Sequence, residues 1–509
     1  MLTTLRPFWR LAAATTFAVA AATAPALAQG SGDGPAITVV ISEEPVDLDP
    51  GNTDYRDISQ ITKLNVLEPL IFQDIRDASL NPRLATDWER VDDTTWRFML
   101  REGVTFHDGT PFNADAVVHS VERIFSEDIS SIVRAQFFGD NRLTATAVDD
   151  MTVDLSVETP DPILLTRIAQ VMMTSPNTPM DQLVREPIGT GPYRFAEWDA
   201  GVEIVLERND DYWGEAPQIE QVTFVWRSEP TVAAQMVEVG EADITMSIPE
   251  DLATTEMDVA YPNFVTLYLI PSAWEAPIDD VRVRRAINYA IDREALVGTL
   301  LPEEERLAVA LFPPQTAGYP DDLEHYPHDP ERARELLAEA AADGVDVDAE
   351  IQMIGINGHF PRSDEVIEAI SAMLNDAGFN TRVRIVETAL YRQYRDKPRL
   401  DEGPVILQAN HDNTTGDAAA TVGRHLCTSN RNPVCDEKLD QMIKEAGSLE
   451  GEARAEAFAE VARYMHEEVL ADILITHRVG FARMAPRLEF DIDGRNAGNF
   501  FIEEMTVTE

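Results

Sequence analysis

The sequence predicts an α/β protein built from two or more lobes. The chain has 509 residues, and a single hydrophobic core stops growing at about 250–300 residues, so more than one core is needed. Segments rich in β-branched residues alternate with amphipathic helical segments, as in layered α/β domains. No internal repeat or low-complexity linker separates them. The lobes are therefore expected to pack closely, without a long tether.

The N-terminus has the pattern of a secretory signal peptide over residues 1–28. Arg6 and Arg10 lead into an apolar run over 11–24, and Ala26-Leu27-Ala28 follows as a small-residue cleavage site. The apolar run, of about 14 residues, is shorter than the ~20 that a membrane-spanning helix needs. We expect cleavage before Gln29, where no cysteine is present for lipid attachment, and a soluble periplasmic protein.

Strands and a helix are predicted in the first part of the chain. Residues 36–41 (AITVVI) have the β-branched content of a strand. Residues 95–100 (TWRFML) alternate in polarity, which is typical of a half-buried strand. Asn113 is a favourable cap for a helix that runs to Ile124 with apolar residues at helical spacing.

A strand-helix-strand unit is predicted further along. Asp329 and Pro330 form a good start for a helix over 330–342. A second helix over 364–377 ends at Gly378. Strands at 350–354 and 381–386 flank this second helix, and such a crossover joins parallel strands.

The charge balance excludes some classes of partner. With 41 basic and 90 acidic residues, the formal net charge is −49. A charge this negative repels nucleic acid and keeps the protein soluble, but does not indicate the fold. Only four of the 41 basic residues are lysines, which is consistent either with GC-rich coding or with adaptation to a saline periplasm.

Four segments in order resemble signatures of one family. They read WRFMLREGVTFHDGTPFNADAVVHSVERI (Trp96–Ile124), PIGTGPYRF (Pro187–Phe195), LERNDDYWGEAPQIEQVTFVWRSEPTVAAQMVEVGEADI (Leu206–Ile244) and IDDVRVRRAINYAIDREALV (Ile278–Val297). Their order and spacing are similar to those of the extracellular solute-binding proteins of family 5. This family comprises the periplasmic receptors of peptide, nickel and opine ABC importers, so the resemblance implies a solute receptor rather than an enzyme.

The resemblance also implies an architecture that periodicity alone does not give. It is the two-lobe periplasmic binding protein fold of type II, with an extra subdomain and with the ligand buried between the lobes. We expect lobe one at 29–75, 184–275 and 479–509, the extra subdomain at 76–183, and lobe two at 276–478.

In peptide-binding members of the family, a carboxylate in a loop before a cysteine pair holds the α-amino group of the ligand. The matching loop here is QANHDNTTGDAAATVGRHLC, residues 408–427, and it includes Asn410 and His411. Asp417, in the Gly-Asp step, matches best, and Asp412 is the second candidate. The loop lacks the family's tryptophan and its Asp-Pro-Asp element, which puts peptide specificity in doubt. Loop residues of these types also commonly bond their own backbone and have no ligand role.

Four further residues are candidates for the ligand pocket. Tyr55 matches a segment that faces the cleft in relatives, and Trp274 lies at the expected crossing between lobes; either aromatic could instead belong to a core. Arg392 and Arg395 could hold a ligand carboxylate through bidentate bonds. The alternative for both arginines is a surface ion pair.

Cys427 and Cys435 are the two cysteines of the chain. In an oxidising compartment they are expected to form a disulfide, and dipeptide-binding relatives have a similar arrangement. A metal site would need more ligands than these two. His325 and His328 lie too close to Pro327 for a helical ligand pair.

The predicted function is that of a receptor that captures short peptides or peptide-like amino compounds for an inner-membrane ABC permease with cytoplasmic ATPase subunits. We expect a monomer that uses no cofactor or metal. The same fold could instead bind an opine, a metallophore or nickel complex, or an oligosaccharide. A secreted hydrolase is disfavoured because the chain has no Gly-x-Ser-x-Gly or His-Glu-x-x-His string. The His107–Thr110 segment (HDGT) is interpreted as a turn, not as a catalytic group.

Overall fold

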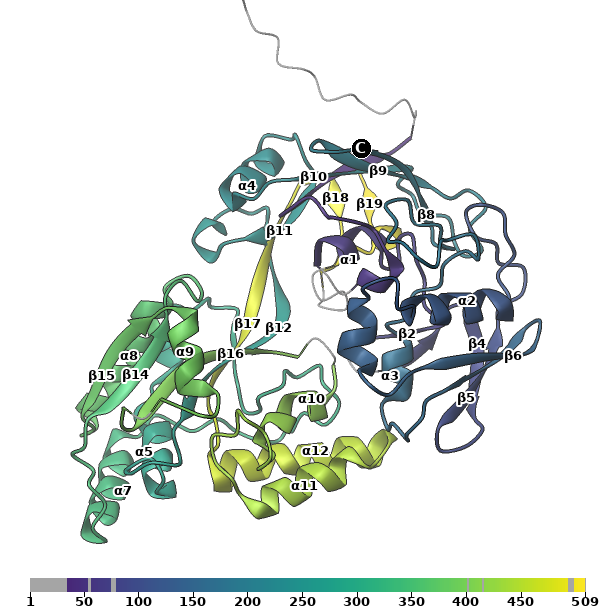
Figure 1. The fold of residues 1–509 in the computed structure, drawn as a ribbon. Helices are drawn as coiled ribbons and strands as arrows, with labels where there is room; N and C mark the ends of the chain where they lie inside the picture. Colours follow the sequence, from purple (N-terminus) through teal and green to yellow (C-terminus); the bar gives the residue numbers. More distant parts are fainter. Residues whose placement is uncertain are drawn as a thin grey trace, which may run out of the picture.

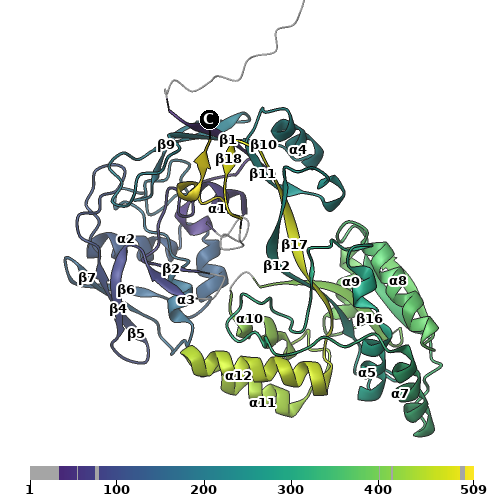
Figure 2. The ribbon, with the colours of Figure 1, turned by 180° about the vertical axis from the view of Figure 1, so that it is seen from behind.

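The computed structural model describes residues 34–53, 56–74, 79–400, 402–413, 416–492 and 499–508. The predicted signal peptide and Tyr55 lie outside these residues. Figures 1 and 2 show two bodies joined by two long strands, β12 (Asp258–Pro271) and β17 (Ile473–Met484). Within the described residues, no helix is both long and apolar enough to span a membrane.

An 11-stranded mixed sheet runs through both bodies, in the order β15-β14-β16-β12-β17-β11-β1-β10-β9-β8, with β13 beside β17. In chain order its strands are β1 (Ala36–Ile41), β8 (Tyr193–Asp199), β9 (Glu203–Arg208), β10 (Gln221–Trp226), β11 (Ile244–Ile248), β12 (Asp258–Pro271), β13 (Arg306–Leu307), β14 (Ile351–Ile356), β15 (Thr381–Val386), β16 (Val405–Asp412) and β17 (Ile473–Met484). The predicted strand over 36–41 is confirmed as β1, which pairs in parallel with β10 and β11.

A smaller sheet lies apart from the main one. Its order is β4-β5-β7-β6, with β4 at Ala85–Arg90, β5 at Thr95–Leu100, β6 at Thr144–Asp149 and β7 at Thr152–Ser156. Helix α2 (Ala114–Ile124) packs on this sheet and begins where Asn113 Oδ1 accepts a hydrogen bond from Ala116 N at 3.0 Å. The predictions of strand 95–100 and of the Asn113-capped helix are confirmed. Apolar residues between Leu70 and Met173 form a separate core here.

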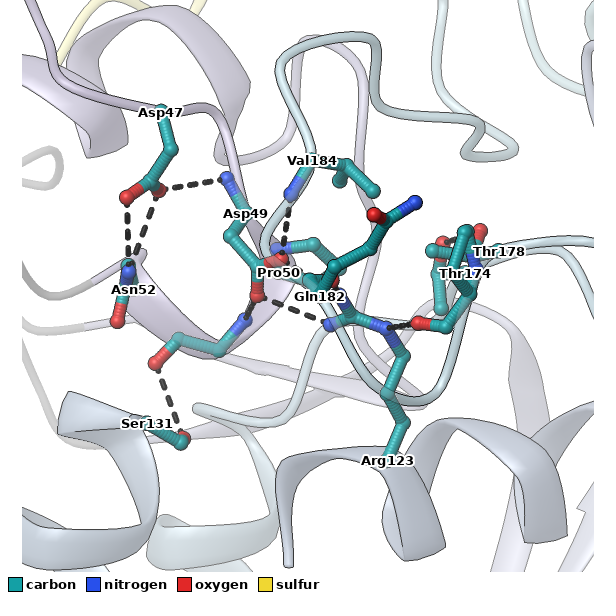
Figure 3. Close-up of polar contacts among 12 residues, drawn as sticks. Asp47, Asp49, Pro50, Asn52, Arg123, Ser131, Thr174, Thr178, Gln182 and Val184 are labelled. Atoms are coloured by element: carbon teal, nitrogen blue, oxygen red, sulfur yellow. Dashed lines mark hydrogen bonds and ion pairs between the residues drawn. The ribbon is translucent and has the colours of Figure 1, made fainter. Parts of the chain in front are cut away.

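A buried ion pair joins this smaller unit to the segment that follows β1 (Figure 3). Arg123, on α2, donates to Asp49 Oδ1 at 2.9 Å and to Asp49 Oδ2 at 2.6 Å. The side chains of Arg123 and Asp49 are only 1% and 0% exposed. Asp49 also caps the short 3-10 helix η1 (Pro50–Asn52), so one carboxylate serves two elements.

Two glycine-containing turns have structural roles. In the HDGT segment, Gly109 adopts a φ of +81°, which an L-residue rarely takes, and His107 bonds the Gly191 carbonyl at 3.0 Å. A Cβ atom at Gly189 would lie 1.9 Å from the carbonyl oxygen of Val66, so only glycine fits there. Both segments therefore contribute to packing, in agreement with the interpretation of HDGT as a turn.

The predicted strand-helix-strand unit is confirmed. Strand β14 precedes helix α8 (Ser363–Asp376) in the chain and β15 follows it, and the two strands pair in parallel. Helix α7 (Pro330–Ala342) begins at Asp329, whose carboxylate accepts from Arg332 N, as the sequence predicted. Leu336, Ile367 and Ile370 contribute to the core of this body.

Strands β12 and β17 change neighbours along their length. Residues 481–484 of β17 pair with β11 in one body, whereas 476–477 pair with β13 in the other. The β12–β17 register shifts between Pro262 and Thr266. Within this step, Phe264 has a φ of 59°, a left-handed conformation that is unusual for a bulky residue. The sequence placed the first crossing at 275/276, beyond the end of β12, and the return crossing at 478/479.

Candidate functional site

A pocket of about 200 Å³ lies beside the second half of β16. We refer to it as the β16 pocket. Its lining residues come from three strands, two helices and three connecting segments: Tyr268, Ile356, His359, Tyr391, Arg395, Ala409, Asn410, His411, Ala420, Thr421, Arg424 and Arg431.

Strand β16 forms one wall. Its sequence VILQANHD is buried through Ala409 and then becomes polar. Its first residues, 405–407, pair with β14, and residues 406–412 pair with β12 on the other side. The apolar start therefore anchors the strand in the sheet, and Asn410 and His411 are positioned at the pocket.

Arg424 and Tyr268 form a second wall. Arg424 is the middle residue of the 3-10 turn η4 (Gly423–His425), which follows helix α10 (Ala418–Val422). Its Nη1 donates to the Tyr268 hydroxyl, and its guanidinium lies 5.0 Å from the Tyr268 ring centroid. Burial lowers the pKa of Arg424 below its usual range, although the Asp472 carboxylate opposes this effect.

Two further arginines share one carboxylate at the rim. Arg395, at the end of helix α9 (Thr388–Arg395), donates to both oxygens of Asp396, at 2.8 and 3.0 Å. Arg431 Nε lies 3.5 Å from Asp396 Oδ1. The Arg395 hydrogen bond is the main cause that lowers the pKa of Asp396. Asp396 is therefore held ionised between the two guanidinium groups.

Burial favours the neutral form of the two histidines of the pocket. His411 Nε2 lies 3.0 Å from Thr421 Oγ1, and burial lowers its pKa. Burial also lowers the pKa of His359, and nearby Arg478 adds to the effect. Each neutral ring offers one donor and one acceptor.

Several buried polar atoms around the pocket have no hydrogen-bond partner among the described residues: His359 Nδ1, Tyr391 Oη, Asn410 Oδ1, Arg424 Nε and Arg424 Nη2. Burying a polar group without a partner costs about 1–3 kcal/mol. These five atoms give the pocket hydrogen-bonding capacity that a ligand or water can use.

The structure brings together three of the residues predicted from sequence. Asn410, His411 and Arg395 all line the β16 pocket. Arg392 lies on the same helix but is exposed and outside the lining. Trp274 is 37% exposed and lies under the Arg399 guanidinium, 3.9 Å from its ring centroid. Trp274 is not part of the pocket lining.

The two candidate aspartates lie in different environments. Asp417 caps α10 by accepting from Ala419 N at 2.9 Å and forms a bidentate ion pair with Arg454 at 3.0 and 3.1 Å. Asp412 is exposed at the end of β16. Neither lines the pocket, and their role with a ligand amine stays a prediction.

The predicted disulfide is present between Cys427 and Cys435. It closes the loop that carries Arg431. Asp440 Oδ1 accepts from Cys427 N at 2.7 Å and so fixes the start of this loop on helix α11 (Glu437–Gly447). No cluster of three or more His, Cys, Asp or Glu side chains suited to a metal ion occurs within the described residues.

Sequence reasoning missed much of the lining. Tyr391 belongs to the YRQYRDK segment that contains Arg392 and Arg395, and Arg424 lies in the loop that contains Asp417. Helical spacing could have linked Tyr391 to Arg395, four positions apart. Tyr268 and His359 are far away in sequence and gave no such signal.

A family model described as bacterial extracellular solute-binding proteins, family 5 middle, matches residues 79–430. Heme-binding protein A of Haemophilus influenzae is 26% identical over 447 residues, which cover 81% of this chain and 81% of that protein. Di/tripeptide-binding protein 2 of Pseudomonas aeruginosa is 25% identical over 471 residues, covering 85% of this chain and 86% of that protein.

Solved structures share the fold. The periplasmic murein tripeptide binding protein MppA, in its unliganded open form, superposes with a TM-score of 0.80 at 20% identity and covers 94% of this chain and 98% of its own. HbpA2 from Haemophilus parasuis gives a TM-score of 0.81 at 20% identity, with coverage of 93% and 100%. The predicted two-lobe α/β class is confirmed. The chain belongs to the bacterial extracellular solute-binding proteins of family 5.

Proposed function

We propose that the protein is the receptor of an ABC importer for short peptides or peptide-like amino compounds. It would capture them in the periplasm after removal of residues 1–28 and deliver them to an inner-membrane permease. The relatives include a dipeptide-binding protein of Escherichia coli, 27% identical over 446 residues. The single observation that carries the proposal is the set of unpartnered polar atoms around the β16 pocket.

The pocket offers the bonds that a peptide requires. Tyr391 Oη and the Arg424 guanidinium can donate to carbonyl or carboxylate oxygens, and Asn410 Oδ1 can accept from an N–H group. Arg395 is proposed to assist at the carboxylate end. The ligand amine is assigned to the loop after β16. Because Asp417 is already engaged by Arg454, exposed Asp412 becomes the first candidate and Asp417 the second.

We further propose the lobe arrangement given above, except that the first crossing lies within β12 and not at 275/276, so that β12 and β17 form the hinge. Binding would then be a closure equilibrium, in which the two bodies come together and remove water from the ligand. In this function no covalent step occurs and the protein works without a cofactor.

Native mass spectrometry of protein purified without refolding tests the proposal. A bound mass that fragments into amino acids supports it. A sugar, a haem or a metal chelate as the bound mass would replace the peptide proposal with the corresponding alternative of the same fold.

A further inference from the structure

The charged side chains that line the β16 pocket all have one sign. They are Arg395, Arg424 and Arg431, and no Asp or Glu lines the pocket. This composition is the reverse of the whole chain, in which acidic residues outnumber basic ones by 90 to 41. The overall composition does not account for three guanidinium groups at one pocket, so their role must lie in the pocket itself.

The carboxylates nearest these arginines leave positive charge uncompensated. Arg395 and Arg431 share the single carboxylate of Asp396. The Asp472 carboxylate acts on Arg424 and also lies 2.8 Å from the ring of His425. With Asp396 and Asp472 both counted, three guanidinium groups face two carboxylates. One positive charge remains.

The unpartnered atoms of Arg424 form the Nε/Nη2 edge of its guanidinium. Other arginines of this protein use the same edge to bind carboxylates. The Nε and Nη2 atoms of Arg424 are buried and have no partner among the described residues. Among the described residues, the same two nitrogen atoms hold a carboxylate in six bidentate pairs: Arg97–Asp154, Arg282–Asp280, Arg395–Asp396, Arg454–Asp417, Arg483–Asp258 and Arg487–Asp243. A buried guanidinium with this edge unfilled favours an anionic partner.

From this geometry we propose that the β16 pocket selects acidic ligands, which present two anionic groups to Arg424 and to the Arg395–Arg431 pair. The inference rests on the proposed receptor function and narrows its ligand class. In a peptide, the two groups are the terminal carboxylate and an acidic side chain next to it. A polycarboxylate metal chelate has the same chemistry, and a NikA protein from Brucella suis with the same fold has been solved in complex with Fe(III)-EDTA.

Isothermal titration with four probes tests this preference: the dipeptides Ala-Ala, Ala-Glu and Ala-Lys, and Fe(III)-EDTA. Ala-Glu is expected to bind at least about tenfold more tightly than Ala-Ala, and Ala-Lys more weakly than both, because like charges across an interface repel. Equal affinity for the three dipeptides would overturn the acidic preference and leave the peptide receptor intact. If only Fe(III)-EDTA binds, the acidic pocket stands and the peptide function fails. If no probe binds, both proposals fail.

Variants assign the preference to the pocket. Arg431→Gln changes a side chain that is 53% exposed, so the fold is expected to persist. The ratio of Ala-Glu to Ala-Ala affinity should fall at least about threefold. Arg424→Gln should lower the ratio further, with a thermal melt to confirm folding. Arg463→Gln is the matched control, because Arg463 pairs with exposed Asp322 away from the pocket. An unchanged ratio in both pocket variants would refute the assignment.

Discussion

Asp49 and Arg123 form a bidentate ion pair in the interior, and every oxygen of the carboxylate is used (Figure 3). Asp49 Oδ1 also accepts from Gly51 N at 2.8 Å, and Oδ2 accepts from Val184 N at 3.1 Å. Arg123 donates further to the carbonyls of Pro179 and Gln182. One pair thus fixes the segment after β1, helix α2 and the return segment near residue 184.

Asp49→Asn is expected to destabilise the protein by about 3–5 kcal/mol, because it leaves the buried guanidinium without its counter-charge. Urea unfolding measures the loss. Asp154→Asn is the control, since it breaks the part-exposed Arg97–Asp154 pair on the smaller sheet and should cost much less than Asp49→Asn. Equal losses in the two variants would contradict the structural role of the Asp49–Arg123 pair.

The Cys427–Cys435 disulfide should leave no free thiol in exported protein. Closing a loop this short contributes roughly 2.5 kcal/mol by the chain-entropy relation, so reduction should lower stability modestly without unfolding the protein. Thiol titration after denaturation without reductant is the measurement. Two reactive thiols per chain would refute the pairing. Because the loop carries Arg431, reduction should also weaken Ala-Glu binding.

Local elements followed well from the sequence. The helix after Asn113 and the helix after Asp329 begin where capping chemistry places them. Strands β1, β5 and β15 have the predicted bounds. These elements depend on caps, β-branched runs and periodicity, which act over a few residues.

The site followed less well, because its walls come from distant segments. Tyr268 and Arg424 are 156 positions apart, yet they bond directly. Asp417 matched a family motif, but its nearest charge is Arg454, on helix α12 (Gly451–Tyr464), which no local pattern links to it. Pairings of this kind depend on tertiary packing and leave no periodic signal in the sequence.

His477 should make the protein less stable as the pH falls. It is buried on β17, bonded to Thr266 Oγ1 at 2.9 Å and facing Tyr319. Burial, with a smaller effect of Arg306, lowers its pKa to about 3. Between pH 6.5 and 3 the unfolded chain binds a proton there that the folded chain does not. The contribution of His477 to the free energy of unfolding is fully present above pH 6.5, and it declines by about 1.4 kcal/mol per pH unit below that pH.

His477→Gln isolates this contribution, since glutamine keeps a donor and an acceptor but does not titrate. The free energy of unfolding is measured between pH 7 and 5 in both proteins. From pH 6.5 to 5, the parent protein should lose roughly 2 kcal/mol more than the variant. Other buried groups titrate equally in both proteins and cancel in the difference. Parallel curves would show that His477 binds its proton in the folded protein as readily as in the unfolded chain, and that its pKa is not lowered.

Asp412→Asn should weaken the binding of amine-bearing ligands without unfolding the protein, because Asp412 is exposed and its strand continues into the pocket wall. Loss of one partner from a desolvated charge pair costs ~2–5 kcal/mol, so affinity for Ala-Glu should fall about 30-fold or more. Affinity for N-acetylated Ala-Glu should be unchanged.

Asp417→Asn keeps the helix cap but loses the ion pair with Arg454. We expect it to lower stability, with a smaller effect on amine binding than Asp412→Asn. Arg454→Gln is its matched variant, because it breaks the same pair and leaves the carboxylate. If Asp417→Asn alone abolishes discrimination between free and acetylated amines, Asp417 is the amine partner and Asp412 is not.

Ligand binding should bring the two bodies together about β12 and β17. The register of β12 against β17 shifts between Pro262 and Thr266, where Phe264 is left-handed, and shifts again between Leu267 and Tyr268. The bodies also meet where Arg90 bonds Glu450 at 2.8 Å. These side chains are 36% and 45% exposed, so the pair contributes about 0–1 kcal/mol and does not lock the arrangement.

Small-angle scattering with and without saturating Ala-Glu should show a smaller radius of gyration when ligand is bound. Arg90→Gln should leave this difference intact. If titration shows binding while the radius of gyration is unchanged, the ligand occupies the β16 pocket without closure, and β12 and β17 are not a hinge.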